Sequence, residues 1–194
     1  FKQHETPRKV VYLGLKDSLT DLQSLVDDIL DEEEMRDVDR SVLDTNFGCF
    51  SLPAPRIVAD YSDDALASIE ACIAAEGVDL IVIDSFSELH DSDENHAQSM
   101  TYIQNFIEEV ASKFNCAVLY LHRSDEDGNP SGSFVIDEAP RCKSVWKLER
   151  VNSKKGIATH KIKHERSWDE DRKTATLLQN SDGGNFRIMN GGTK

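Results

Sequence analysis

Apolar residues in the first two thirds of the chain follow two alternating patterns. Short, nearly continuous apolar runs occur at Lys9–Leu15, Leu80–Ile83 and Cys116–His122, and such runs are typical of buried strands in a parallel sheet. Apolar residues three and four positions apart occur at Asp17–Leu30 and Asn95–Phe114, which predicts amphipathic helices. The order strand, helix, strand, helix, strand predicts an α/β fold, with a mostly parallel central sheet and helices on both faces.

The segments between these elements carry weaker signals. Residues 62–77 predict a further amphipathic helix that ends at Gly77, because glycine often terminates helices. Residues 31–43 are consistent with an acidic helix or a loop, and residues 47–60 with irregular chain or a short strand. Residues 125–133 are rich in turn-forming side chains and predict a loop.

The pattern changes in the last third of the chain. Four segments there alternate apolar and polar residues without a long helix, which is typical of antiparallel or mixed strands. They are Ser144–Val151, Gly156–Glu165, Lys173–Gln179 and Asn185–Met189. We expect them to extend one edge of the sheet, so that residues 1–194 form a single domain with a parallel α/β core (1–150) and a C-terminal β extension (151–194).

The composition suits one compact domain. Of the 194 residues, 39% are hydrophobic, enough for a domain with its own core. The four cysteines lie far apart without a CxxC pair, so neither a zinc site nor a disulfide framework is predicted. No apolar run reaches the ~18 residues of a membrane span, and we expect a cytoplasmic protein with no membrane partner.

The charge is distributed unevenly. Residues 1–140 contain 9 Lys and Arg against 30 Asp and Glu, a net charge of −21, whereas residues 141–194 contain 13 against 6, a net charge of +7. A polyanion would therefore meet the C-terminal part of the chain. The acidic helices of the first part are consistent with solvated faces or with a surface for a basic partner.

The strand Leu80–Ile83 runs directly into an acid, Asp84, which Ser85 follows. A carboxylate at the C-terminal end of a central parallel strand usually faces a ligand crevice, often through a magnesium ion and phosphates. A hard cation takes oxygen ligands, and the rigid end of a strand holds one in place. The residue types alone leave open a second role for Asp84, as a cap of the next turn.

Three stretches of the sequence, in this order, resemble RecA-like ATPases, in particular the RepA-type replicative helicases of plasmids and phages. They are Val10–Leu22, Asp79–Met100 and Cys116–Arg150, and His160–Ile188 is similar to the closing strands of that family. The resemblance covers nearly the whole chain. It implies a RecA-like three-layer sandwich, ATP and Mg²⁺ as cofactors, and a ring-shaped homo-oligomer that acts on single- or double-stranded DNA.

Taken residue by residue, the resemblance implies a nucleotide site at the strand ends. Asp84 matches the Walker B aspartate, which binds magnesium through water, and Ser85 lies beside it as a further cofactor contact. His122 and Arg123 match the polar pair that senses the γ-phosphate, and polar residues at the end of a buried strand are placed to touch a ligand. A histidine in this position is also consistent with a purely structural role.

The glutamate that polarises the attacking water in the family is replaced here. This chain has Lys16 at that position, followed by Asp17, and a protonated lysine cannot act as a base near neutral pH. Asp17 is therefore the candidate catalytic carboxylate, although neighbouring strand residues face opposite sides of a sheet. The residue pattern also fits Asp17 as the N-cap of the following helix.

Residues of the C-terminal third match the family segments that contact DNA and the neighbouring subunit. The candidates for contact with DNA are Gly132, Ser133, Arg141, Lys143, Lys154 and Lys155. Lys163 and Arg166 resemble the catalytic lysine and arginine that reach the γ-phosphate of the neighbouring subunit, with a spacing one residue longer than in the family. An ordinary surface loop is the alternative for Gly132 and Ser133.

The phosphate loop of the family, GxxxxGK[ST], is absent from the sequence. In the family it precedes the strand that here begins at Lys9, and this chain begins with Phe1 instead of methionine. Two explanations stay open: a piece of a longer ATPase, or a degenerate relative. Because that loop cradles the phosphates, we expect this chain to bind no cofactor tightly and to hydrolyse ATP poorly or not at all.

Two other functions are consistent with the residues. Lys16 suits a non-catalytic RecA-like module whose acidic helices bind a basic partner. The stretch Leu80–Leu89 is also similar to the corresponding strand of recombinases, which leaves a recombination or signalling ATPase of the same fold as a further option. Since a fold does not determine a function, the choice of a helicase rests on the resemblance.

Overall fold

The computed structural model describes residues 6–31, 39–51, 67, 70, 71, 73, 77–125, 127, 129–140, 143–152, 157–166, 175–180 and 186–189; from residue 143 on, Ile162 is the one residue whose side chain is described. The chain divides into two compact units, Phe1–Arg123 and Ser124–Lys194. The predicted organisation as a single domain, with residues 1–150 as core and 151–194 as extension, stays a prediction.

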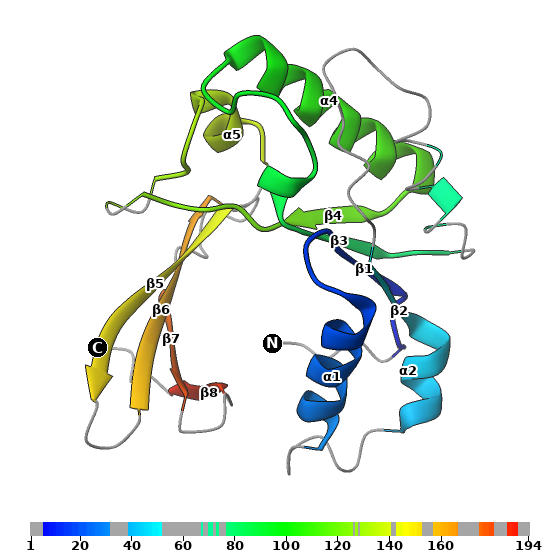
Figure 1. The fold of residues 1–194 in the computed structure, drawn as a ribbon. Coiled ribbons are helices and arrows are strands. Elements are labelled where there is room, and N and C mark those ends of the chain that lie inside the picture. Colours follow the sequence, from blue (N-terminus) through cyan, green and yellow to red (C-terminus); the bar gives the residue numbers. More distant parts are fainter. Residues whose placement is uncertain are drawn as a thin grey trace. The chain divides into compact units, whose positions relative to one another are not determined.

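The first unit contains a parallel sheet of four strands. The strands are β1 (Val10–Gly14), β2 (Phe47–Ser51), β3 (Leu80–Asp84) and β4 (Ala117–Tyr120), and their order is β2-β1-β3-β4 (Figure 1). All three strand pairs are parallel, with Leu13 opposite Ile83 and Ile83 opposite Tyr120. The predicted α/β class with a parallel central sheet is therefore confirmed.

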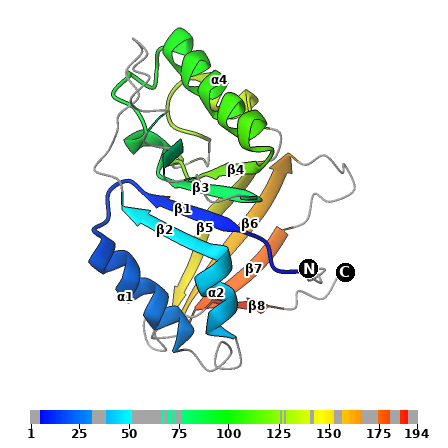
Figure 2. The same cartoon turned by 90° about the vertical axis from the view of Figure 1, so that its right-hand side faces the viewer.

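Helices cover both faces of this sheet. Helices α1 (Leu19–Leu30) and α2 (Arg40–Asn46) lie on one face and α4 (Ala97–Phe114) on the other (Figures 1 and 2). Helix α4 ends where Asn115 takes a left-handed conformation with φ of 49°, a conformation that asparagine tolerates better than most residues. This arrangement is consistent with the three-layer sandwich that the resemblance to RecA-like ATPases implies.

Much of the buried core of the first unit comes from the central strands of the sheet and from α4. Phe86, Met100 and Ile103 are fully buried, as are Leu13 and Ile81 of the two central strands. Burial of each such side chain stabilises the fold by about 1.5–3 kcal/mol. Helix α1 is held less firmly: of its apolar residues Leu22 alone is buried, whereas Leu19, Leu25 and Ile29 are exposed.

The second unit contains an antiparallel sheet. After the short helix α5 (Phe134–Glu138), strands β5 (Lys143–Asn152), β6 (Ile157–Arg166), β7 (Ala175–Asn180) and β8 (Phe186–Met189) pair in chain order. The alternating pattern correctly indicated these strands. They form a sheet of their own, and their predicted attachment to an edge of the parallel sheet is not shown.

The sequence left residues 47–60 as irregular chain or a short strand, and the structure places β2 at Phe47–Ser51, paired with β1. The predicted helix at residues 62–77 lies mostly outside the described residues. In the part of the chain that the structure describes, no helix is long and apolar enough to cross a membrane.

Candidate functional site

The C-terminal ends of β1, β3 and β4 meet at one edge of the parallel sheet, which we call the carboxyl edge. The backbone N–H of Leu15 donates to the carbonyl oxygen of Asp84 at 2.8 Å, and that of Phe86 donates to Leu121 at 2.7 Å. These bonds continue the sheet pairing for one residue beyond the strands. The segments that follow the three strands are therefore adjacent, and they carry Lys16, Asp84 and His122.

Asp84 is half-buried at the end of β3, and its carboxylate forms a hydrogen bond with a side chain of the neighbouring strand β1. The phenol of Tyr12, on β1, donates to Asp84 Oδ2 at 2.6 Å. Burial raises the pKa of Tyr12 above its ordinary value, and the hydrogen bond and negative charge of Asp84 raise it further. Tyr12 therefore remains a donor at neutral pH. Sequence reasoning missed Tyr12, because its contact with Asp84 depends on the register of β1 against β3, two strands that lie far apart in the sequence.

Asp84 does not serve as the cap of the next turn, which the residue pattern left open. The 3-10 helix η2 (Phe86–Glu88) begins after Ser85 without a side-chain cap, and the carboxylate of Asp84 accepts from Tyr12 instead. The carboxylate thus remains at the carboxyl edge, in the position from which it can meet a ligand.

The oxygen atoms at Asp84 suit a magnesium ion whose other ligands are water molecules and phosphate oxygens. Among the described residues there is no cluster of three or more His, Cys, Asp or Glu side chains suited to a metal ion. Magnesium usually keeps several waters and takes one or two carboxylates together with substrate phosphates. A lone carboxylate beside the half-buried Ser85 suits that mode and does not suit a closed metal cage.

Lys16 and Asp17 follow β1 at the carboxyl edge, and both residues are exposed. The ammonium of Lys16 lies 2.9 Å from Glu88 Oε1, and the Lys16 side chain is 76% exposed. The carbonyl oxygen of Asp17 accepts from the Ser51 hydroxyl at 2.7 Å, and the Asp17 side chain is exposed. The alternative of Asp17 as the N-cap is wrong: Ser18 caps α1, in a capping box with Asp21.

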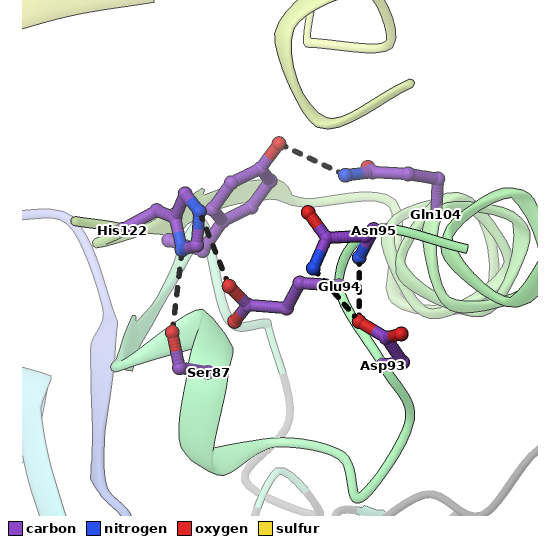
Figure 3. A network of polar contacts seen from close by, with 7 residues as sticks. Ser87, Asp93, Glu94, Asn95, Gln104 and His122 are labelled. Atoms are coloured by element: carbon purple, nitrogen blue, oxygen red, sulfur yellow. Dashed lines mark hydrogen bonds and ion pairs between the residues drawn. The ribbon is translucent and has the colours of Figure 1, made fainter. Parts of the chain in front are cut away.

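His122 follows β4 and is held from several sides (Figure 3). Its Nδ1 lies 3.4 Å from Ser87 Oγ and its Nε2 lies 3.9 Å from Glu94 Oε2. Its ring meets that of Phe86 edge-on, with the ring centres 5.3 Å apart. Arg123, the next residue, is exposed. The sequence did not single out Ser87 and Glu94, since nothing in their spacing connects them to His122.

A second histidine, His90, lies close to the same cluster without a comparable partner. It is 3% exposed, and neither ring nitrogen meets a hydrogen-bond partner at good geometry. Burial lowers the pKa of His90, against smaller opposing effects of Glu94 and the Ser92 backbone. Its ring meets Phe86 with 5.0 Å between the ring centres. His90 is therefore a neutral residue at neutral pH.

The remaining predicted site residues belong to the second unit or lie outside the described residues. Gly132 is exposed with φ of 94°, whereas Ser133 is buried and its hydroxyl accepts from the N–H of Val135 as the N-cap of α5. Lys143 is on β5, and Lys163 and Arg166 are on β6, where Arg166 is opposite Lys143. The predicted residues outside the described ranges are Arg141, Lys154 and Lys155.

The structure thus brings Lys16, Asp84 and His122 to one edge. Asp17 lies next to that edge, and Arg123 is the last residue of the first unit. The roles predicted for these residues, and for those of the second unit, stay predictions.

A comparison with known protein families matches most of the chain. The family described as "AAA domain" matches residues 1–129, or 129 of the 194 residues, which covers the parallel sheet and the whole carboxyl edge. No curated protein matches the chain.

Proposed function

The chain belongs to the AAA domain family, and we propose that it forms the ATPase domain of a RecA-type replicative DNA helicase. In this proposal the carboxyl edge of the parallel sheet is the nucleotide site. Asp84 and Ser85 would hold the magnesium ion of ATP through water, and His122 and Arg123 would meet the γ-phosphate. Lys163 and Arg166 would act at the site of a neighbouring subunit in a ring.

The arrangement around Asp84 is the observation that supports this proposal most strongly. A half-buried carboxylate at the end of a central parallel strand is costly unless it has a partner, and here a single phenol occupies one of its oxygens at 2.6 Å. Ligands of open parallel sheets bind at the carboxyl ends of the strands. His122 follows the adjacent strand and adds a second ligand-type side chain at that edge.

The absence of GxxxxGK[ST] from the sequence limits the affinity that we expect. Without the N–H groups and lysine of that loop, the triphosphate lacks its main cradle, and the contacts through magnesium, His122 and Arg123 do not replace it. We therefore expect MgATP to bind with a Kd of about 1 mM or weaker, about −4 kcal/mol, and we expect hydrolysis to be slow or undetectable. Clear magnesium-dependent turnover by the purified chain would contradict this part of the proposal.

The test is a titration of the purified chain with ATP, followed by NMR, with and without magnesium. We expect shifts around Asp84 and His122 that require magnesium and that are lost in Asp84→Asn. The matched control is Asp28→Asn, because Asp28 is an exposed acid on α1. Shifts that persist without magnesium, or that Asp84→Asn leaves unchanged, would exclude this edge as the nucleotide site.

DNA binding requires a separate test. The net charge of +7 in residues 141–194 supports a contact with the phosphate backbone. Binding of fluorescent single-stranded DNA should weaken steeply with salt, and Lys154→Ala with Lys155→Ala should reduce the slope of log K against log salt by about 1–2. Lys9→Ala is the control in the acidic part of the chain. An unchanged slope would exclude Lys154 and Lys155 from the DNA contact.

The ion pair between Lys16 and Glu88 favours a second candidate, a non-catalytic module of the same fold. Lys16 takes the place of the family's glutamate and its ammonium lies 2.9 Å from Glu88, so position 16 offers no base. In this alternative the acidic helices bind a basic partner. Salt-sensitive binding of an oligolysine peptide, together with an absence of any effect of MgATP, would favour the module over the enzyme.

A further inference from the structure

His122 is enclosed by contacts from two segments of the first unit. Ser87 Oγ faces Nδ1 at 3.4 Å and Glu94 Oε2 faces Nε2 at 3.9 Å. The Phe86 ring packs edge-on against the imidazole at an angle of 77°, and only 7% of the His122 side chain is exposed. Because both nitrogens have a neighbour, the ring has one preferred orientation.

The loop that carries Glu94 is closed by its own hydrogen bonds. The carboxylate of Asp93 accepts from the Asn95 backbone at 2.9 Å and from the Asn95 amide at 3.0 Å, and the N–H of His96 donates to the Asp93 carbonyl at 3.0 Å. This turn leads directly into α4 and leaves Glu94 directed at His122 (Figure 3). The Glu94 side chain is 15% exposed, so its charge is largely removed from water.

A carboxylate favours a proton on the nitrogen that faces it, whereas a serine hydroxyl can donate or accept. Of these two contacts, Glu94 is therefore the one that distinguishes the two nitrogens of His122. We propose that Glu94 is a positioning residue that fixes the ring orientation of His122 and its Nε2–H tautomer. This role rests on the proposed function in one respect: His122 is the predicted γ-phosphate sensor, and its Nε2–H would be the group that donates to the phosphate.

The separation of 3.9 Å between Glu94 Oε2 and Nε2 is longer than a hydrogen bond, so Glu94 acts on the ring through its charge. A phosphate that accepts from the Nε2–H of His122 would lie next to this carboxylate, and the two negative charges would repel each other. His90 and Asp91, on the segment after η2, are two further titratable groups near this cluster, and the ring of His90 packs against the same Phe86 ring as His122.

The test is the tautomer of His122, measured by long-range ¹H–¹⁵N correlation in the full chain with ¹⁵N-labelled histidine. Spectra are recorded at about pH 8.5, well above the ordinary histidine pKa of about 6.5. We expect the Nε2–H pattern in the wild-type chain and in Glu94→Asp, which keeps the carboxylate. Glu94→Ala should give a mixture of both tautomers. Glu109→Ala, an exposed glutamate on α4, should match the wild type.

An Nδ1–H pattern in the wild type, or an unchanged Nε2–H pattern in Glu94→Ala, would overturn the proposal. If Glu94→Ala does not fold, Glu94→Leu replaces it, since leucine fills the space without an acceptor. Addition of MgATP to the wild type tests the proposed function separately. If His122 does not respond to MgATP while Glu94→Ala changes its tautomer, ATP is excluded as the ligand and the role of Glu94 stands.

Discussion

The two sides of the carboxyl edge differ in how firmly their polar residues are held. Asp84 and His122, at the ends of β3 and β4, are at least half-buried and have defined partners in Tyr12, Ser87 and Glu94. Lys16, at the end of β1, is 76% exposed and makes one surface ion pair. Burial makes a polar partner necessary, whereas exposure makes it optional.

This difference has a functional meaning within the proposed site. A group that must bind a metal or a phosphate needs a fixed position, and the β3 and β4 side provides one. The β1 side, where the resemblance to RecA-like ATPases implies a water-activating residue, carries the exposed side chains of Lys16 and Asp17. Under the proposed function, the carboxyl edge is therefore better preorganised for ligand contact than for base catalysis, and the following predictions test the contrast.

The largest effect is expected from Phe86→Ala. Phe86 is fully buried and its ring contacts those of His90, Tyr120 and His122. Its loss should lower the free energy of unfolding by about 3–5 kcal/mol, as measured by urea denaturation. The control is Phe134→Ala, because Phe134 is 64% exposed and should change stability by less than about 0.5 kcal/mol. Similar losses in both variants would contradict the described core.

Tyr12→Phe should have an intermediate effect. It removes the hydrogen bond to the Asp84 carboxylate at 2.6 Å and leaves a half-buried charge without that donor, which typically costs about 1–3 kcal/mol. The loss caused by Tyr12→Phe should largely disappear when Asp84 is also replaced by Asn. The asparagine side chain is neutral, so removal of the Tyr12 hydroxyl no longer leaves a charge without its donor. A double-mutant cycle in urea measures this coupling, and additive losses would show that the contact does not stabilise the fold.

The pH dependence of stability should report His90. Its pKa is lowered by burial in the folded state, so the unfolded chain takes up a proton first as the pH falls. The stability that neutral His90 contributes is complete above its ordinary pKa of about 6.5 and is lost at lower pH. His90→Leu should flatten the dependence of Tm on pH between about pH 7 and pH 5. An equally steep profile in this variant would assign the acid sensitivity to other groups.

The smallest effect is expected from Lys16→Ala. The pair with Glu88 is close, at 2.9 Å, but the lysine is mostly in water, and such pairs stabilise proteins by about 0–1 kcal/mol. We expect a change in Tm of less than about 3 °C, measured by circular dichroism. A much larger loss would show that the β1 side is held as firmly as the β3 side, and the contrast between the two sides would no longer hold.

Most of the fold could be predicted from local patterns. The apolar runs located β1, β3 and β4, and the helical spacing located α1 and α4, because these elements are long and strongly periodic. The short elements β2 and α5 carried little or no signal of their own, since β2 is formed through its pairing with β1. The cap of α1 was assigned one residue too early, because Asp17 and Ser18 are both good capping residues.

By itself, the sequence determined the α/β class, the parallel sheet and the placement of Asp84 and His122 at strand ends, because periodicity and residue type are local properties. The tertiary structure decided the partners of those residues. Tyr12 reaches Asp84 through the register of β1 against β3, and Glu94 reaches His122 through the turn at Asp93. Such contacts join residues tens of positions apart, and only the folded chain defines them.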